Sequence, residues 1–174
     1  RCAQARRVSF VEEPLSAPDI LPTPEVTARG ERLFVVVPRL PSGLNPEQSV
    51  HQVRGLIDDW VAEQLNRRFI AWYYTPMALK FSRHLQPAAV VYDCMDELSN
   101  FKAGPPELRT LEDELFRLAD VIFTGGVGLY EHKRSKHPNV HPFPSSVDCS
   151  HFRSARMLEQ EPRDQQALPR PRIG

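Results

Sequence analysis

The 174-residue sequence has few cysteines, no excess of charge of either sign and no long apolar run. Its three cysteines, Cys2, Cys94 and Cys149, are widely spaced and form no CxxC pair, which argues against a zinc site or a redox dithiol. Scattered cysteines of this kind fit a reducing compartment. We therefore expect no metal centre and a location inside the cell.

Charge and hydropathy exclude further classes of protein. Lysine plus arginine number 22, as do aspartate plus glutamate, so the overall charge gives no reason to expect nucleic acid as a partner. No apolar run approaches the roughly 18 residues that a membrane-spanning helix needs. No signal-peptide core follows the basic start of the chain. We expect a cytoplasmic protein, and peripheral association with the inner face of the membrane stays open.

Both ends of the sequence have the character of interior chain. It begins with RCAQARR, which is typical of the tail of a helix, and it ends with LPRPRIG, a proline-punctuated stretch that precedes an apolar segment. The length suits one domain with a real core. We expect that domain over residues 1–152, with its first strand and helix incomplete, and a linker over residues 153–174.

Strand-like and helix-like segments alternate along the chain. We expect strands at Val8–Val11, Leu33–Val37, Phe69–Tyr73, Ala88–Tyr92, Val121–Thr124 and Val140–Phe143. A hairpin limb is expected at residues 26–31, after an irregular loop at residues 15–24. Helices are expected from the Asn45, Pro46 and Gln48 cap to about Leu65, from Thr75 through Phe81, from Pro105 through Leu118 and after Gly128 to about Lys136. This alternation predicts an α/β fold with a doubly wound parallel sheet and flanking helices.

The apolar run Ala88–Tyr92 ends in two carboxylates, Asp93 and Asp96, and Glu97 follows directly. A buried parallel strand that delivers acidic side chains to the edge of a sheet has this pattern, and ligands of open α/β folds bind beyond that edge. A partly buried carboxylate beside another negative charge has a raised pKa and accepts protons more readily, so one of the two could act as a general base. Aspartates also commonly cap turns and helices, and this structural alternative stays open.

A glycine-rich segment, TGGVGLYE, stands between an expected strand and an expected helix. Its glycines Gly125, Gly126 and Gly128 could let backbone amides approach an anion at the start of the helix. It is incomplete as a dinucleotide-binding fingerprint, because Glu131 stands where the third glycine would fall. A tight strand-to-helix turn is an equal alternative.

Histidines and aromatic residues offer weaker signals. His132, His137 and His141 do not predict a metal site, because no acidic partner has matching spacing. Trp72 and the tyrosines that follow it could line a sugar cleft, since flat apolar rings suit the faces of sugars. Core or rim packing at a strand end is the alternative for these rings.

Four segments together resemble the amino-terminal domain of bacterial two-domain GT-B glycosyltransferases. They are WYYTPMAL, VVYDCMDELSNFKAGPPEL, ADVIFTGGVGLYEHKR and HPNVHPFPSSVDCSHF, and they cover roughly residues 69–152. The last is similar to the family's NGVD…F segment, with Ser145 and Ser146 in place of its asparagine and glycine. Many members have a histidine where Met95 stands, so the neighbouring Asp96 becomes the candidate for the polar catalytic role.

The resemblance implies a Rossmann-like half that binds the sugar acceptor. It implies that the donor, a nucleotide-diphosphate sugar, binds mainly to a second half beyond this chain, that no cofactor is needed, and that this chain alone is inactive. The intact enzyme would build surface polysaccharide or glycolipid, with Asp96 orienting or deprotonating the acceptor hydroxyl and Asp93 supporting it. The implied substrate-binding residues are Tyr74, Thr75, Glu97, Gly125, Gly126, Gly128, Ser145, Ser146 and Asp148. A non-catalytic Rossmann-like binding module is the alternative.

Overall fold

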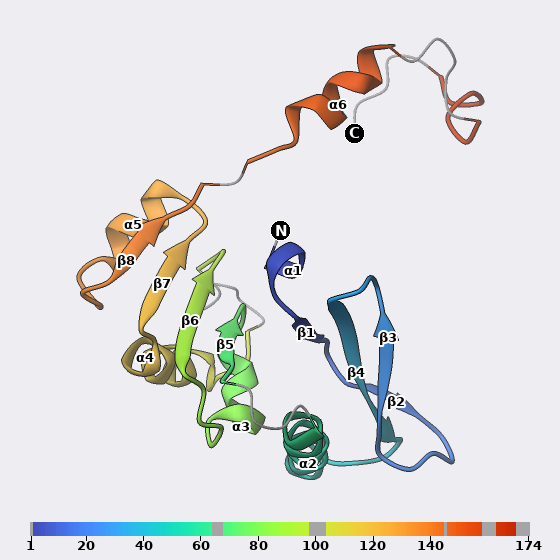
Figure 1. Cartoon of the computed structure of the whole chain (residues 1–174), viewed down its shortest axis with the longest axis vertical. Helices are drawn as coiled ribbons and strands as arrows, with labels where there is room; N and C mark the ends of the chain where they lie inside the picture. The colour runs from blue at the N-terminus through green and yellow to red at the C-terminus, as the bar shows by residue number, and fades with distance from the viewer. Residues whose placement is uncertain (1, 64–67, 98–103, 145, 158–162, 170–174) are drawn as a thin grey trace. The chain divides into compact units, whose positions relative to one another are not determined.

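The computed structural model describes residues 2–63, 68–97, 104–144, 146–157 and 163–169. The chain divides into two compact units, residues 1–143 and residues 144–174, which are described separately below. In the first unit, mostly parallel strands form two four-stranded sheets that are flanked by helices (Figure 1). The expected α/β, Rossmann-like fold is therefore confirmed, with its strands divided between two sheets.

The first sheet is organised around β4 (Leu33–Pro41). After the short helix α1 (Cys2–Ala5), β1 (Val8–Val11) and β2 (Leu15–Ala17) pair in parallel with successive stretches of β4, and β3 (Thr23–Ala28) pairs with it in antiparallel fashion. The hairpin limb expected near residue 26 is thus a strand. The irregular loop expected at residues 15–24 is wrong at both of its ends, because β2 and β3 draw those residues into the sheet.

β4 continues past its expected end at Val37 and includes Pro38 and Pro41. Pro38 lies opposite Pro24 of β3, and the parallel partners of β4 skip Pro38, since β1 ends opposite Val36 and β2 begins opposite Arg39. Proline lacks an N–H group to donate to a neighbouring strand. The pairing therefore places Pro38 at a point where the sheet uses no hydrogen bond from that residue.

Helix α2 (Pro46–Glu63) begins with the expected reciprocal cap. The Gln48 N–H donates to Asn45 Oδ1 at 2.8 Å, and the Asn45 N–H donates to Gln48 Oε1 at 3.0 Å. This arrangement satisfies backbone donors that the first helical turn leaves unpaired. The core that α2 forms consists of Leu40, Val53, Leu56 and Ile57, with Val11, Leu44, Val61, Phe81 and Leu85 packed against it. The expected end of this helix near Leu65 lies outside the described residues.

The second sheet positions the candidate site. Its strands are β5 (Ile70–Tyr73), β6 (Ala89–Cys94), β7 (Val121–Thr124) and β8 (Val140–Pro142), all parallel and in that order. The connecting elements are η1 (Pro76–Ala78), α3 (Leu79–Ser82), α4 (Leu108–Leu118) and α5 (Val127–Lys133). Because the strands run in one direction, their carboxyl ends meet at a single edge of the sheet.

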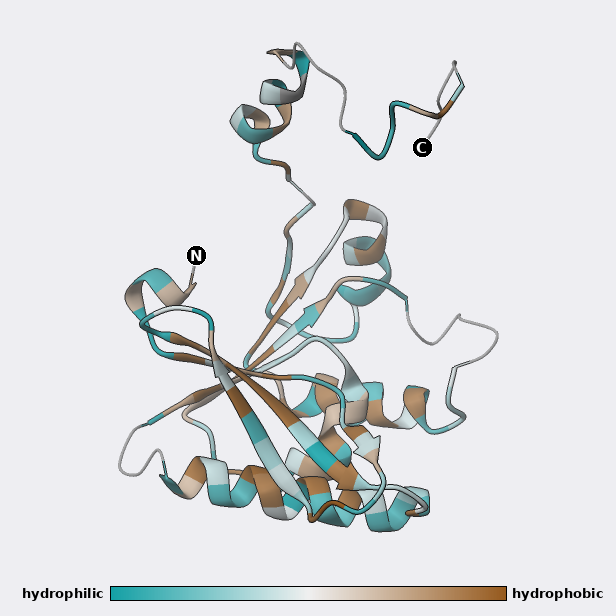
Figure 2. Cartoon of the chain, turned by 90° about the vertical axis from the view of Figure 1, so that its right-hand side faces the viewer, coloured by the Kyte–Doolittle hydropathy of each residue, from teal (hydrophilic) through white to brown (hydrophobic). Residues whose placement is uncertain are grey.

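One face of this sheet is buried against α4. Leu115 of α4 and Ile122 of β7 are fully buried, and the Tyr92 ring meets the Phe116 ring edge to face at a centroid distance of 5.7 Å. Hydrophobic and hydrophilic residues alternate along the helices (Figure 2), as expected for helices with one face on a core. β6 ends two residues later than expected, so Asp93 lies within the strand and the buried Cys94 ends it.

The second unit contains α6 (Cys149–Ser154) and the short helix η3 (Ala155–Met157). The Asp148 carboxylate caps α6, because its Oδ1 accepts hydrogen bonds from the Ser150 and His151 N–H groups, both at 3.0 Å. Parts of the expected linker, residues 158–162 and 170–174, lie outside the described residues. Among the described helices of the whole chain, none is long and apolar enough to cross a membrane.

Candidate functional site

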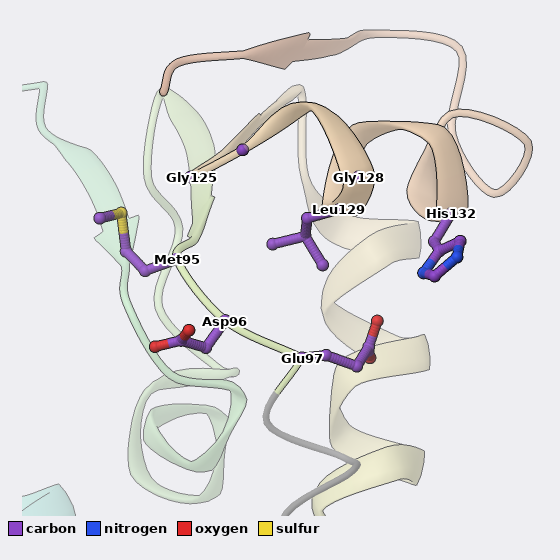
Figure 3. A pocket seen from close by; sticks show the side chains of 8 residues that line it. Met95, Asp96, Glu97, Gly125, Gly128, Leu129 and His132 are labelled. Carbon is purple, nitrogen blue, oxygen red and sulfur yellow. The ribbon is translucent and has the colours of Figure 1, made fainter. Parts of the chain in front are cut away.

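A pocket of about 340 Å³ opens at the carboxyl edge of the second sheet (Figure 3). One side comes from the residues that follow β6, and the other from the turn between β7 and α5 and from α5 itself. The lining residues are Met95, Asp96, Glu97, Gly125, Gly126, Gly128, Leu129 and His132. The structure thus brings together two of the predicted carboxylates and all three predicted glycines.

Gly125 allows two backbones to pass in close contact. A Cβ atom at this position would lie 2.8 Å from the Met95 carbonyl oxygen and 3.2 Å from the Met95 Cα atom. The Gly125 N–H donates to the Cys94 carbonyl oxygen at 3.0 Å, so it is already engaged within the protein. Gly125 therefore holds the end of β6 against the end of β7. This structural role agrees with the tight turn that the sequence offered as the alternative to anion binding.

Gly126 and Gly128 differ from Gly125 in what surrounds them. A Cβ atom at either position would meet nothing within 4 Å. Gly126 is extended, with φ of −166°, and immediately precedes the first residue of α5. These two glycines leave one wall of the pocket as bare backbone, where a bound molecule could approach closely.

Glu97 is held in the pocket wall by a buried lysine. The Lys133 ammonium, whose side chain is 1% exposed, donates to Glu97 Oε1 at 2.6 Å and to Glu112 Oε1 and Oε2 at 3.0 and 3.1 Å. Burial by itself would lower the pKa of Lys133, but the hydrogen bonds from its ammonium to Glu97 and Glu112 outweigh that effect and raise the pKa. Lys133 therefore stays charged and fixed.

The same network extends into the core through Glu112 and Tyr92. Glu112 is 2% exposed, and its Oε1 accepts a further hydrogen bond from the Tyr92 hydroxyl at 3.1 Å. Burial, with the nearby Cys94 and Glu112, raises the pKa of Tyr92, so this hydroxyl remains protonated and donates. A paired and hydrogen-bonded carboxylate avoids the large cost of a lone buried charge.

Asp93 is separate from the pocket and is not among the described residues that line it. It neighbours the buried Cys94 on β6, so the two side chains point to opposite faces of the sheet. Its Oδ2 accepts a hydrogen bond from the Trp72 indole N–H at 3.3 Å. Burial raises the pKa of Asp93 and the Trp72 hydrogen bond lowers it again in part. The raised pKa agrees with the expectation for a partly buried carboxylate, and burial is its largest cause.

Three predicted residues near β5 make local contacts of their own. Tyr74 is 51% exposed, and its partial burial, together with the charge of Asp93, raises its pKa. Thr75 Oγ1 accepts a hydrogen bond from the Met77 N–H at 3.3 Å and so caps η1. Tyr73 is a core residue, and its hydroxyl lies 2.9 Å from Ser82 Oγ. Tyr74 and Asp93 therefore form a group apart from the pocket.

The predicted serine and aspartate residues after β8 belong to the second unit. Ser145 lies outside the described residues, Ser146 is exposed, and Asp148 caps α6. The contacts of Asp148 are therefore described within the second unit only.

His132 lines the pocket, and the sequence pattern did not single it out for this role. The signal that could have found it is its spacing, because Gly128 and His132 lie one turn apart on α5.

The other two histidines considered for a metal site bind Asn139 instead. The Asn139 N–H donates to His137 Nδ1 at 3.1 Å, and His141 Nε2 lies 2.7 Å from Asn139 Oδ1. Within the described ranges, no three His, Cys, Asp or Glu side chains form a group that could hold a metal ion.

The chain matches no protein-family model and no curated protein sequence. Its class is therefore given by its own architecture, an α/β unit whose parallel sheet carries an acidic, glycine-walled pocket at the carboxyl edge.

Proposed function

We propose that this chain is the acceptor-binding half of a GT-B glycosyltransferase. The intact enzyme would transfer a sugar from a nucleotide-diphosphate sugar to a hydroxyl group in surface polysaccharide or glycolipid synthesis. The observation that carries the proposal is the pocket that Asp96 and Glu97 line together with the bare backbone of Gly126 and Gly128. Open α/β sheets bind their ligands beyond the carboxyl ends of the strands, where this pocket lies. The resemblance of the sequence segments supports the same function.

Asp96 is the residue proposed to act on the acceptor. Its side chain is exposed and lines the pocket, so an acceptor hydroxyl can reach the carboxylate. As the hydroxyl oxygen forms its bond to the anomeric carbon of the donor sugar, the bond from that carbon to the diphosphate breaks and the nucleoside diphosphate leaves with the electron pair. Asp96 takes the proton of the hydroxyl, which is the work of a general base.

Asp93 and Tyr74 are proposed to act from outside the pocket. Asp93 of β6 accepts a hydrogen bond from the Trp72 indole of the neighbouring strand β5. This bond fixes the end of β6, and Asp96 follows that end directly. We therefore assign Asp93 a positioning role in the proposed reaction. Tyr74, exposed beside it, is proposed to contact the distal part of the acceptor.

The first test is turnover in the protein extended to the natural ends of its reading frame. Asp96→Asn should lower the rate of sugar transfer on the order of a hundredfold or more, because removal of a general base has an effect of that size. Asp113→Asn is the matched control, since Asp113 is an exposed acid on α4 that does not line the pocket. A rate for Asp96→Asn within a few-fold of the parent would show that Asp96 has no catalytic role.

A second test separates the transferase from a non-catalytic module. UDP and several nucleotide sugars would be titrated by calorimetry into this chain and into the extended protein. Binding to the extended protein alone is the result expected of a two-domain transferase. No binding to either protein would favour the binding module instead.

A further inference from the structure

The Lys133 ammonium has three N–H donors, and three carboxylate oxygens accept from it. Two of these oxygens belong to the buried Glu112, which by itself neutralises the charge of Lys133. The third is Glu97 Oε1, on a side chain that is 24% exposed and lines the pocket. Glu112 thus fixes the ammonium group in the core, and the one remaining N–H of Lys133 donates to Glu97 in the pocket wall.

The charges around the pocket favour one kind of ligand. Glu112 offsets Lys133, so the two carboxylates that line the pocket, Asp96 and Glu97, leave the wall acidic. A phosphate group would be repelled by these carboxylates, whereas hydroxyl groups can donate hydrogen bonds to them. In addition, the Gly125 N–H is already bound to the Cys94 carbonyl oxygen.

We infer that Lys133 is a positioning residue, which holds the Glu97 carboxylate in the pocket wall as an acceptor for the hydroxyl groups of a neutral sugar. This inference rests on the proposed function and narrows it, because it assigns the pocket to the sugar acceptor and excludes the donor diphosphate. Lys133 follows His132 on α5, so one short helix presents an imidazole to the pocket and an ammonium to the core.

The decisive variant replaces the buried pair together, as Lys133→Met/Glu112→Gln. It removes one positive and one negative charge, so the net charge beside the pocket is unchanged and no lone charge remains in the core. Glu97 loses the hydrogen bond from Lys133 but keeps its negative charge. The control is Glu112→Gln alone, in which Lys133 still donates to Glu97. Glu97→Gln serves as a second, direct variant that leaves the buried pair intact.

Each protein would be ¹⁵N-labelled and titrated at pH 8, where an imidazole in water is neutral. The probes are methyl α-D-glucopyranoside, which is neutral, and glucose 1-phosphate, which is anionic. The readout is the shift of the Gly126, Gly128 and Leu129 amide signals. We expect the neutral glucoside to bind the parent more tightly than the phosphate ester does. Its affinity should fall at least fivefold in the double variant and in Glu97→Gln, and stay within about twofold in Glu112→Gln.

Three results would overturn the inference. They are tighter binding of glucose 1-phosphate than of the glucoside, undiminished glucoside affinity in the double variant, and no shift of these amides with either probe. Because sugar transfer is not measured here, the outcome is separate from that of the proposed function. A chain that binds the glucoside as expected, in a protein that transfers no sugar, would leave the pocket inference standing and the transferase wrong.

Discussion

The backbone of Met95 lies against Gly125 so closely that a Cβ atom on Gly125 would stand 2.8 Å from the Met95 carbonyl oxygen. The neighbouring hydrogen bond from the Gly125 N–H to the Cys94 carbonyl oxygen, at 3.0 Å, holds the same two segments together. These contacts join the end of β6 to the turn after β7. The pocket therefore depends on a glycine that need not touch any ligand.

Gly125→Ala should destabilise the protein by about 1–3 kcal/mol, because the added methyl group overlaps backbone atoms that cannot rotate away. Urea unfolding followed by circular dichroism would measure the loss. Gly126→Ala is the matched control: it adds the same methyl group where nothing lies within 4 Å and where an extended backbone accepts any residue. Its free energy of unfolding should stay within about 0.5 kcal/mol of the parent. Equal effects of the two substitutions would contradict the close approach at Gly125.

Asn45→Ala should lower the free energy of unfolding by about 1 kcal/mol, since it removes the side-chain cap of α2. Asn45→Asp keeps an oxygen that can accept from the Gln48 N–H, so it should retain most of the stability. Thermal unfolding of the two variants side by side would test this. An alanine variant as stable as the aspartate variant would show that the cap contributes nothing.

The stability of the protein should depend on the protonation of Asp93. Its pKa is raised in the folded state above the ordinary value of 3.8, so the folded chain holds this proton more tightly than the unfolded chain does. Below 3.8 the carboxyl is neutral in both states, and stability is lost as the pH rises from there through the folded pKa. Asp93→Asn has no such charge to bury. Its melting temperature should therefore gain on the parent as the pH is raised from 4 to 7.

Trp72→Phe provides the opposite test of the Asp93 site. The indole N–H is the hydrogen bond that holds the pKa of Asp93 down, so its removal should raise this pKa further and enlarge the loss of stability between pH 4 and pH 7. Melting temperatures over this pH range would be compared with those of the parent. A pH dependence equal to that of the parent would show that the Trp72 hydrogen bond has no influence on Asp93.

Lys133→Met alone should be far more damaging than the paired substitution. It leaves Glu112 buried and without its cation, and breaking a buried ion pair in this way costs about 3–5 kcal/mol. Adding Glu112→Gln removes the stranded charge and should restore most of the loss. Urea unfolding of the single and double variants would measure the difference. A double variant no more stable than the single one would argue that Lys133 is needed for packing rather than for charge.

Local signals in the sequence were sufficient for most of the fold and for part of the site. Residues close in the sequence determine three of these features, because capping and periodicity act over a few positions. They are the cap formed by Asn45 and Gln48, the Thr75 cap, and the alternation of strands and helices. The same holds for Asp96 and the glycines, since a strand that ends in polar residues marks the edge of a parallel sheet. These elements were predictable before any tertiary contact was known.

Tertiary structure alone decided which side chains meet. Pro38 stays in β4 because its neighbours β1, β2 and β3 demand no N–H at that point. Asp93 faces Trp72 rather than Asp96, because β6 continues past Tyr92 and the alternation of the strand turns its side chain to the other face. Lys133 meets Glu97 from 36 residues away, and no local pattern encodes a contact over that separation. The sequence determined where the sheet edge would lie, and the packing of α4 and α5 on the sheet determined which carboxylate is held there.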